Sequence, residues 1–320
     1  LMFNFVLQKI RPIARSIIYS RLLKRAAKDS TNNVEELSPP VSFVVGCGRS
    51  GTTIMGKLLA AHPEVLYLFE PYHIWKVVCP QTDMIQLYTK DGSETHCILG
   101  DGLIGDNEIQ RFNACMQGEL QRSDNQSKKI IEKTPINAMR IPMLKKVSPQ
   151  SPILHLVRDG IDVVRSINIL ASSNTYQLSG KGDWNQWWGR SHCKWKALLA
   201  DAKENQWFAD EVDQLETDIE VGALEWLVSL SEINTNKDAL GDALLEVRYD
   251  KLTSEPNIQL ATICAHFGIQ PEGQWMADSC AKLDSARKNK GNPVLLPPKM
   301  CEAFNAFQEL YGFEGRAVTK

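Results

Sequence analysis

The fold of this chain is decided by one stretch, Val41-Ser-Phe-Val-Val-Gly-Cys-Gly-Arg-Ser-Gly-Thr-Thr-Ile-Met-Gly-Lys-Leu-Leu59. Its first five residues are mostly apolar and predict a strand, the glycine-rich segment predicts a tight turn, and the residues from 52 onward predict a helix. Such a turn directs free backbone N–H groups and the positive end of a helix dipole toward one spot. We therefore expect a phosphate-binding loop, whose candidate contacts are Gly48, Arg49, Ser50, Gly51, Thr52 and Thr53.

The loop fits different phosphate ligands to different degrees. The glycines Gly46, Gly48 and Gly51 match the G-x-G-x-x-G fingerprint of dinucleotide-binding proteins, and Glu70 stands 19 residues after the last of them, where an acid that binds a ribose is expected. A nucleoside triphosphate fits less well, because Thr52 occupies the position of the lysine in a triphosphatase loop. The loop by itself leaves the dinucleotide alternative open.

A second motif favours a different nucleotide. Residues 151–157 are mostly apolar and predict a buried strand that ends at Arg158, and Ser166 follows eight residues later, two turns into the next predicted helix. An arginine at a strand end and a serine at this spacing can both bind one phosphate from the side. Dinucleotide folds do not require such a pair, so the motif argues against the dinucleotide alternative.

Strand and helix patterns alternate along the chain from residue 41. Predicted strands at 41–45, 65–69, 153–157 and 244–249 are interleaved with predicted helices at 52–61, 160–170 and 256–267. This order is typical of an α/β fold with a central parallel sheet flanked by helices on both faces. Residues 90–129 and 171–183 lack strong periodicity and are expected to be substrate-side insertions or lids. Residues 184–230 are expected to be helical.

The charge of the chain is distributed unevenly. Residues 1–30 contain seven Lys and Arg but one Asp, which leaves 29 basic and 37 acidic residues, a net charge of −8, for the rest. We expect a basic amphipathic helix and linker over residues 1–40 and the main domain over 41–320. The helix is expected to contact an anionic membrane surface through residues 1–28, or to pack on its own domain. The acidic remainder argues against a nucleic-acid partner.

The compartment and metal content follow from weaker signals. We find no signal peptide and no transmembrane span in the sequence, and expect a cytoplasmic protein, with peripheral membrane contact as the alternative. The eight cysteines form no C-x-x-C pair, so neither zinc nor a disulfide scaffold is expected, and no cluster of ligands for another metal is recognisable.

Taken together, the two phosphate motifs resemble those of the sulfotransferases that use 3′-phosphoadenosine 5′-phosphosulfate (PAPS). Gly48-Arg-Ser-Gly-Thr-Thr resembles their 5′-phosphosulfate loop, and Leu156-Val-Arg-Asp-Gly through Ser166 resembles their 3′-phosphate motif. The resemblance implies a sulfotransferase-like fold related to P-loop NTPases. It also implies an enzyme that transfers a sulfonate from PAPS to an acceptor hydroxyl and releases adenosine 3′,5′-bisphosphate (PAP).

Two branches of that family are most similar. Residues 62–75 resemble the carbohydrate sulfotransferases that act on sugar 6-hydroxyls, while the spacings of Glu70 after Arg49 and of Arg158 after Lys133 resemble the tyrosylprotein branch. A carbohydrate acceptor is therefore favoured, and lipid, peptide and polyketide hydroxyls stay open. The other functions left open are an NAD(P)-dependent oxidoreductase and a phosphate-binding adaptor without catalytic activity.

Sulfuryl transfer needs a base for the acceptor hydroxyl and charge that neutralises the reacting group. Glu70 lies at the predicted end of the second strand, among apolar neighbours that are expected to raise its pKa, and the tyrosylprotein branch implies that it is the base. His73 is the competing base, and a purely structural Glu70 is the third option. The family implies that Lys133 contacts the sulfonate, the alternative being a solvated lysine.

The remaining candidates are weaker. Tyr249, in a late segment that also resembles the family, is expected near the cofactor or in the core. Arg287 and Lys288 resemble a basic loop that closes over the 3′-phosphate in some branches, or form a solvated run of charge. Three tryptophans are expected to stack on an acceptor ring or to belong to the core: Trp184, Trp187 and Trp188.

Overall fold

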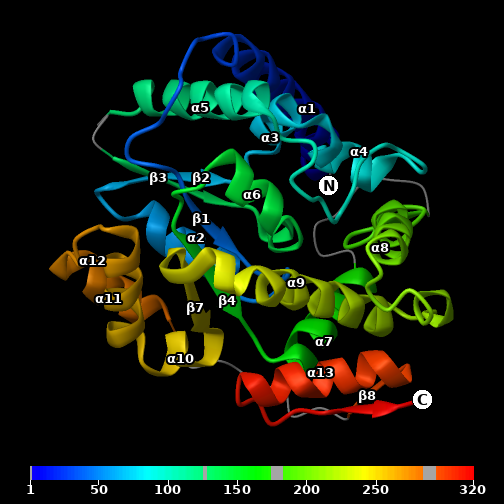
Figure 1. The fold of residues 1–320 in the computed structure, drawn as a ribbon. Coiled ribbons are helices and arrows are strands. Elements are labelled where there is room, and N and C mark those ends of the chain that lie inside the picture. The colour runs from blue at the N-terminus through cyan, green and yellow to red at the C-terminus, as the bar shows by residue number, and fades with distance from the viewer. Residues whose placement is uncertain (1, 125–127, 174–182, 284–292) are drawn as a thin grey trace.

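The central element of the fold is a parallel sheet (Figure 1). The computed structural model describes residues 2–124, 128–173, 183–283 and 293–320, with side chains from residue 16 onward. Within these residues the sheet has five strands in the order β2-β3-β1-β4-β7, all paired in parallel. Their bounds are β1 Ser42–Val45, β2 Val65–Phe69, β3 Lys129–Lys133, β4 Ile153–Val157 and β7 Leu244–Arg248. The predicted α/β fold with a central parallel sheet is confirmed.

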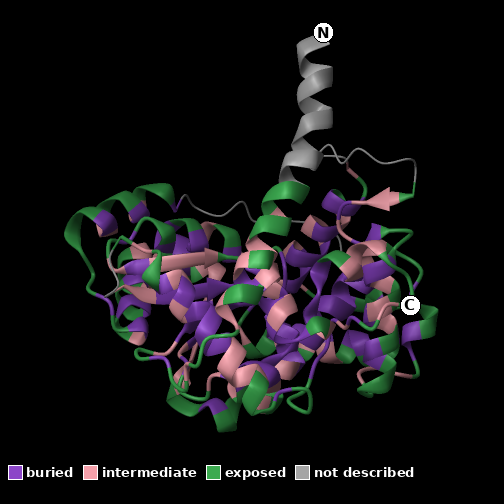
Figure 2. Cartoon of the chain, turned by 90° about the horizontal axis from the view of Figure 1, so that it is seen from above, coloured by how far each residue is buried: buried purple, intermediate pink, exposed green. Residues whose placement is uncertain are grey.

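Both faces of the sheet are buried at β1 and β4, which explains the mostly apolar sequences of these two strands. Phe43 and Val45 of β1 belong to one core cluster, whereas Val44 between them belongs to a cluster on the opposite face. Figure 2 shows buried residues running through the interior of the molecule between exposed helix surfaces. Since side chains alternate along a strand, every second residue of β1 packs under a different set of helices.

Three groups of helices supply this core. One face is covered by α3 (Tyr72–Val78), α5 (Asp106–Gln121) and α6 (Ile141–Val147). The other face is covered by α2 (Thr52–Ala60), α11 (Pro256–Phe267) and α12 (Gly273–Lys282). A third cluster lies beyond the carboxyl ends of β1 and β4 and contains α7 (Gly160–Ala171), α8 (Cys193–Glu204), α9 (Asp218–Leu240) and α13 (Pro298–Leu310). The remaining elements are α4 (Met84–Thr89), α10 (Tyr249–Ser254), β5 (Trp184–Asn185), β6 (Gly189–Arg190), β8 (Val294–Leu296) and β9 (Ala317–Thr319), with short 3-10 turns at 80–82, 135–139, 212–214 and 241–243.

The segment 90–129, expected to be irregular, contains the 16-residue helix α5 and the first residue of β3. The helical period of α5 is interrupted because non-apolar residues also occupy its buried side. Asn113 is buried and donates a hydrogen bond to the carbonyl oxygen of Glu35, and Gly118 lies against the side chain of Asp29. The lack of strong periodicity in this segment therefore did not predict the helix over residues 106–121.

Residues 184–230, expected to be helical throughout, begin instead with the two short antiparallel strands β5 and β6. Helix α8 follows, and α9 begins after Thr217, whose hydroxyl accepts from the N–H of Glu220 while the carboxylate of Glu220 accepts from the N–H of Thr217. This reciprocal pair is a capping box and fixes the start of the helix. Of the other segment expected to be irregular, residues 174–182 lie outside the described part of the chain.

The described side chains of helix α1 (Met2–Asp29) pack on α3 and α5. Ala26 is buried, Arg25 forms an ion pair with Glu119 at 2.7 Å, and Arg122 forms one with Asp29 at 2.8 Å. The last part of the helix therefore belongs to the fold of the domain, one of the two arrangements expected from the sequence. In the described part of the chain, no helix combines the length and apolar character needed to cross a membrane.

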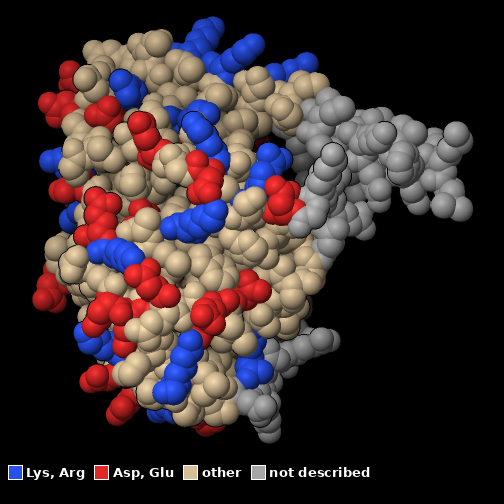
Figure 3. Space-filling view, turned by 90° about the vertical axis from the view of Figure 1, so that its right-hand side faces the viewer, with Lys and Arg blue, Asp and Glu red and all other residues tan. Residues whose placement is uncertain are grey.

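The surface charge is mixed. On the face shown in Figure 3, acidic and basic side chains alternate without a large area of one sign. This distribution agrees with the net charge of −2 for the whole chain.

Candidate active site

The glycine-rich loop, residues 46–51, joins the carboxyl end of β1 to the first turn of α2. Gly51 has a φ of 97°, and a Cβ atom there would lie 2.2 Å from the ring of Tyr249, so only glycine fits. Gly51 also precedes the helix without a side chain that could cap it. The first N–H groups of α2, including those of Thr52 and Thr53, therefore have no acceptor within the helix and are suited to an anion.

The two phosphate motifs meet at this loop. The Nε atom of Arg49 donates to the hydroxyl of Ser166 in α7 at 2.9 Å, and Nη1 of Arg158 donates to the carbonyl oxygen of Arg49 at 3.1 Å. Arg158 follows the last residue of β4, which pairs directly with β1. Residues more than 100 positions apart in the sequence thus form one cationic group at the carboxyl edge of the sheet.

The direction of Arg158 is set by its neighbours. Its guanidinium forms an ion pair with Asp162 at 3.1 Å and lies 5.3 Å from the centre of the Tyr249 ring. Its Nε atom is buried and has no hydrogen-bond partner. Tyr249 thus lies between Gly51 and Arg158, so the structure places it in the group formed by the two motifs.

The turn that carries Arg158 is held from outside the sheet. Trp226 of α9 donates from Nε1 to the carbonyl oxygen of Arg158 at 3.1 Å. Gln308 of α13 accepts from the N–H of Gly160 at 2.9 Å and donates to the carboxylate of Asp159 at 3.2 Å. Two helices late in the sequence therefore fix the backbone of the predicted 3′-phosphate motif.

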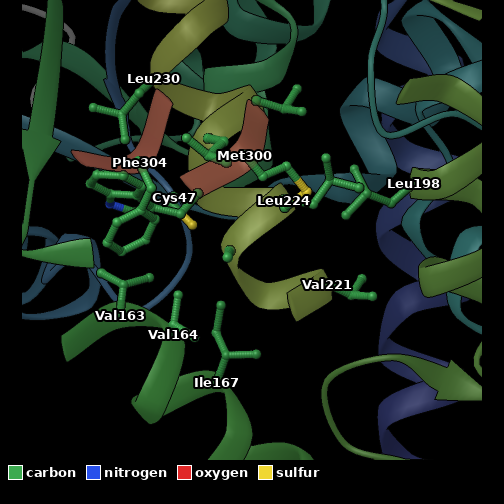
Figure 4. Packing of buried hydrophobic residues seen from close by; sticks show 14 of the residues in the cluster. Cys47, Val163, Val164, Ile167, Leu198, Val221, Leu224, Leu230, Met300 and Phe304 are labelled. Atoms are coloured by element: carbon green, nitrogen blue, oxygen red, sulfur yellow. The ribbon is translucent and has the colours of Figure 1, made fainter. Parts of the chain in front are cut away.

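Cys47 anchors the loop in the core. Its side chain lies in the cluster that includes Val163 and Val164 of α7 and Phe304 of α13 (Figure 4). Burial, followed by the nearby carboxylate of Glu225, raises the pKa of the Cys47 thiol well above its ordinary value. The thiol therefore stays protonated and packs as a small apolar group.

Glu70 and Lys133 form an ion pair at the ends of β2 and β3. The distance from Nζ of Lys133 to Oε1 of Glu70 is 2.5 Å, and the backbone N–H of Glu70 donates to the carbonyl oxygen of Lys133. Lys133 is completely buried, and its ammonium lies 4.2 Å from the centre of the Phe69 ring. The alternative of a solvated lysine is wrong. The expected apolar setting of Glu70 is also wrong, because an ammonium group contacts its carboxylate.

Tyr72 was not among the residues expected at the site. Its hydroxyl donates to the second carboxylate oxygen of Glu70 at 2.5 Å. Burial and then the charge of Glu70 raise the pKa of Tyr72 well above its ordinary value, so the phenol remains a donor. The signal in the sequence was its position in the first turn after the strand end, two residues beyond Glu70.

Glu132, next to Lys133, is a second buried acid that the sequence did not single out. Its Oε1 accepts hydrogen bonds from the indole of Trp75 at 3.0 Å and from the hydroxyl of Thr134. Burial raises the pKa of this carboxyl to about 7. Glu132 thus supports β3 from the side that faces α3.

His73 lies apart from these groups. The charges that act on its pKa belong to Glu119 of α5, Arg25 of α1 and Arg122, the residue after α5. Burial lowers its pKa from 6.5. Successive residues of a helix point about 100° apart, and Tyr72, not His73, turns toward Glu70. The structure therefore does not bring His73 together with the other candidate catalytic residues.

The other weak candidates have different positions. Trp188 is completely buried, Trp184 is half-buried beside Arg190, and Trp187 lies against Gly48 of the loop. Arg287 and Lys288 lie outside the described residues.

The parallel sheet has the glycine-rich loop at the carboxyl end of one strand and Arg158 at the carboxyl end of the next. This arrangement defines a class of α/β proteins that bind nucleotide phosphates between a strand–loop–helix unit and a second strand end. The chain matches the model of the sulfotransferase family over residues 40–212, more than half of its length, and belongs to that family.

Curated relatives match over a part of the chain. Protein-tyrosine sulfotransferase 1 of Danio rerio is 25% identical over 163 residues, which are 51% of this chain and 45% of that protein. Protein-tyrosine sulfotransferase 2 of Gallus gallus is 30% identical over 132 residues, 40% of this chain and 33% of that protein. The matches thus span less than half the length of these relatives.

Solved structures share the fold. The sulfotransferase domain from the Synechococcus PCC 7002 olefin synthase has a TM-score of 0.50 at 14% identity, over 88% of this chain and 98% of that domain. The sulfotransferase domain from the curacin biosynthetic pathway has a TM-score of 0.50 at 15% identity, over 87% of this chain and 99% of that domain.

Proposed function

We propose that this chain transfers a sulfonate group from PAPS to an acceptor hydroxyl and releases PAP. The observation that carries the proposal is the contact between the two phosphate motifs, through Arg49 with Ser166 and Arg158 with the carbonyl of Arg49. A nucleotide with phosphates on both its 5′ and 3′ positions needs two such groups side by side. A dinucleotide, whose pyrophosphate needs one glycine-rich loop, leaves the second group unexplained.

The residues at the carboxyl edge of the sheet fit a nucleotide with both a 5′- and a 3′-phosphate. Arg49 and the first-turn N–H groups of α2 would hold the 5′-phosphate, and Arg158 with Ser166 would hold the 3′-phosphate. The unpartnered Nε of Arg158 supports this assignment, because a buried donor without an acceptor is costly unless a ligand supplies one. An arginine also offers a phosphate two parallel hydrogen bonds. PAPS supplies the sulfonate and a good leaving group.

Glu70 is proposed as the base. Lys133 contacts one of its carboxylate oxygens and Tyr72 the other, so the side chain has one orientation and keeps free lone pairs. Its side chain is 21% exposed, so an acceptor hydroxyl can reach it. The carboxylate takes the proton of that hydroxyl, while the ammonium of Lys133 provides positive charge close by.

The acceptor is proposed to contain a ring close to its reacting hydroxyl. Phe69 precedes Glu70 and is 60% exposed, and its ring centre lies 4.2 Å from the ammonium of Lys133, which contacts the carboxylate of Glu70. A carbohydrate acceptor agrees with the resemblance of residues 62–75 to the carbohydrate sulfotransferases. The names of the curated relatives point instead to a tyrosine side chain. Both kinds of ring pack on an aromatic face, and we favour the carbohydrate.

Calorimetric titration with PAP, NAD and ATP tests the proposal. We expect PAP to bind and NAD not to bind. Arg158→Ala removes a charge-assisted contact worth about 1.5–3 kcal/mol and should weaken PAP binding about 10- to 150-fold. Arg190→Ala, which removes an exposed arginine of β6, is the matched control and should bind PAP like the wild type. Binding of NAD without binding of PAP would contradict the proposal.

A further inference from the structure

Trp187 lies in direct contact with the phosphate loop. A Cβ atom on Gly48 would lie 2.4 Å from Cη2 and 2.7 Å from Cζ2 of the Trp187 indole, so close that the indole or the loop would have to move. Gly48 does not have a positive φ of the kind that favours glycine. The close approach of the indole, rather than a turn, therefore requires glycine at this position.

The indole is held on its other sides by buried polar groups. Its Nε1 donates to Oε2 of Glu225 at 2.9 Å, and Nζ of Lys194 lies 4.3 Å from the centre of the ring. The same ammonium contacts both carboxylate oxygens of Glu225 at 2.8 Å. The backbone N–H of Trp187 donates to the side chain of Asn185 at 2.8 Å. Backbone, ring nitrogen and ring face are thus all fixed.

The pair of Lys194 and Glu225 is almost completely buried, with side chains 3% and 4% exposed. Replacing either member would leave an uncompensated buried charge, which is strongly unfavourable. Such a pair contributes little to stability compared with apolar packing, but it fixes geometry. Here the geometry that it fixes is the position of one indole ring against Gly48.

We infer that Trp187 is a positioning residue of the PAPS site, which holds the backbone of Gly48 in the conformation that binds the 5′-phosphate. The inference rests on the proposed function and adds a residue that contacts the phosphate loop. It also links two parts of the enzyme. Trp187 lies in the turn between β5 and β6, so a change in that hairpin that moves the indole reaches the phosphate loop.

The test compares Trp187→Phe with Trp188→Phe. Trp188 is the matched control, because it is buried in the same hairpin and donates from its own Nε1 to Asp218 at 2.6 Å. We expect Trp187→Phe to weaken PAP binding on the order of 10-fold, since a hydrogen bond to a charged group is lost and the loop shifts. The KM for PAPS should rise by a similar factor while kcat changes less. Trp188→Phe should keep the wild-type Kd at an equal fraction of folded protein.

A second measurement keeps the inference falsifiable if these variants lose stability. Addition of PAP should change the tryptophan fluorescence of the wild type and of Trp188→Phe, and this change should shrink in Trp187→Phe. Gly48→Ala should weaken PAP binding more in the wild type than in Trp187→Ala, where the added methyl group finds space.

The outcomes separate the two proposals. Equal PAP affinity of the wild type and Trp187→Phe, with equal fluorescence changes, would overturn the inference and leave the proposed function intact. No PAP binding by the folded wild type would overturn both.

Discussion

At the scale of single residues, the carboxylate of Glu70 has a partner on each oxygen, the ammonium of Lys133 and the hydroxyl of Tyr72. Glu70→Gln keeps the size and most of the hydrogen-bonding capacity of the side chain but removes its basicity. We expect kcat to fall by about 10²–10⁴ with little change in PAP affinity, measured by initial rates at saturating substrates and by titration.

His73→Ala is the comparison for that experiment. Because His73 lies beside Glu119 and Arg25, we expect its loss to alter kcat only a few-fold. Near-normal turnover of Glu70→Gln would show that another group takes the proton. If Glu70 instead bound a ribose, as in a dinucleotide enzyme, Glu70→Gln would lose cofactor affinity.

The sequence was sufficient to predict some of the site residues but not others. Motif spacing was sufficient for Arg49, Ser166 and Arg158, because a strand end and the helix after it have fixed geometry, and the structure brings them together. Spacing did not distinguish Tyr72 from His73. They are neighbours in the sequence, and only the packing of α3 against its surroundings decides which of the two turns toward Glu70.

At the scale of elements, helix α1 supports a prediction about stability. Ala26 belongs to the core cluster that includes Phe112 and Cys115 of α5, and the thiol of Cys115 donates to the carbonyl oxygen of Ala26. Deletion of residues 1–30 should therefore expose apolar surface of α5 and lower the Tm measured by calorimetry. Deletion of residues 1–15 is the control and should lower it less. Equal Tm values for both deletions and the full chain would show that the helix adds no stability.

Strand β3 shows why some elements were not predicted. Its sequence, Lys-Ile-Ile-Glu-Lys, contains three charged residues, which are unusual in a central strand. The structure compensates for two of them through Glu70 with Lys133 and through Trp75 with Glu132. Partners from distant parts of the chain make this burial possible, and they cannot be read from a local pattern.

At the scale of the whole molecule, Glu132 makes the stability depend on pH. Burial raises its pKa in the folded protein from 4.5 to about 7, so between these values the folded state binds a proton that the unfolded state has released. The contribution of this proton to the free energy of unfolding is present in full below pH 4.5 and is lost as the pH rises through 7. At about 1.4 kcal/mol per pH unit, it is worth up to about 3 kcal/mol.

Glu132→Gln has no such proton to lose. Relative to the wild type, its free energy of unfolding should therefore increase by about 2–3 kcal/mol between pH 5 and pH 8, measured by urea unfolding. Glu255→Gln, which changes a carboxylate that is 39% exposed, is the control and should follow the wild type more closely. If the free energy of unfolding of Glu132→Gln and that of the wild type changed by the same amount between pH 5 and pH 8, burial would not raise the pKa of Glu132 in this way.

The contacts of Gln308 have a consequence for the synthesis of the chain. A protein leaves the ribosome from its N-terminus, so β1, the phosphate loop and β4 emerge long before α13. Until residue 308 is available, the N–H of Gly160 lacks its acceptor and the side chain of Asp159 lacks one of its donors. The turn that carries Arg158 therefore reaches its final form only after α13 has been synthesised, so the nascent chain completes its second phosphate-binding group later than its phosphate loop.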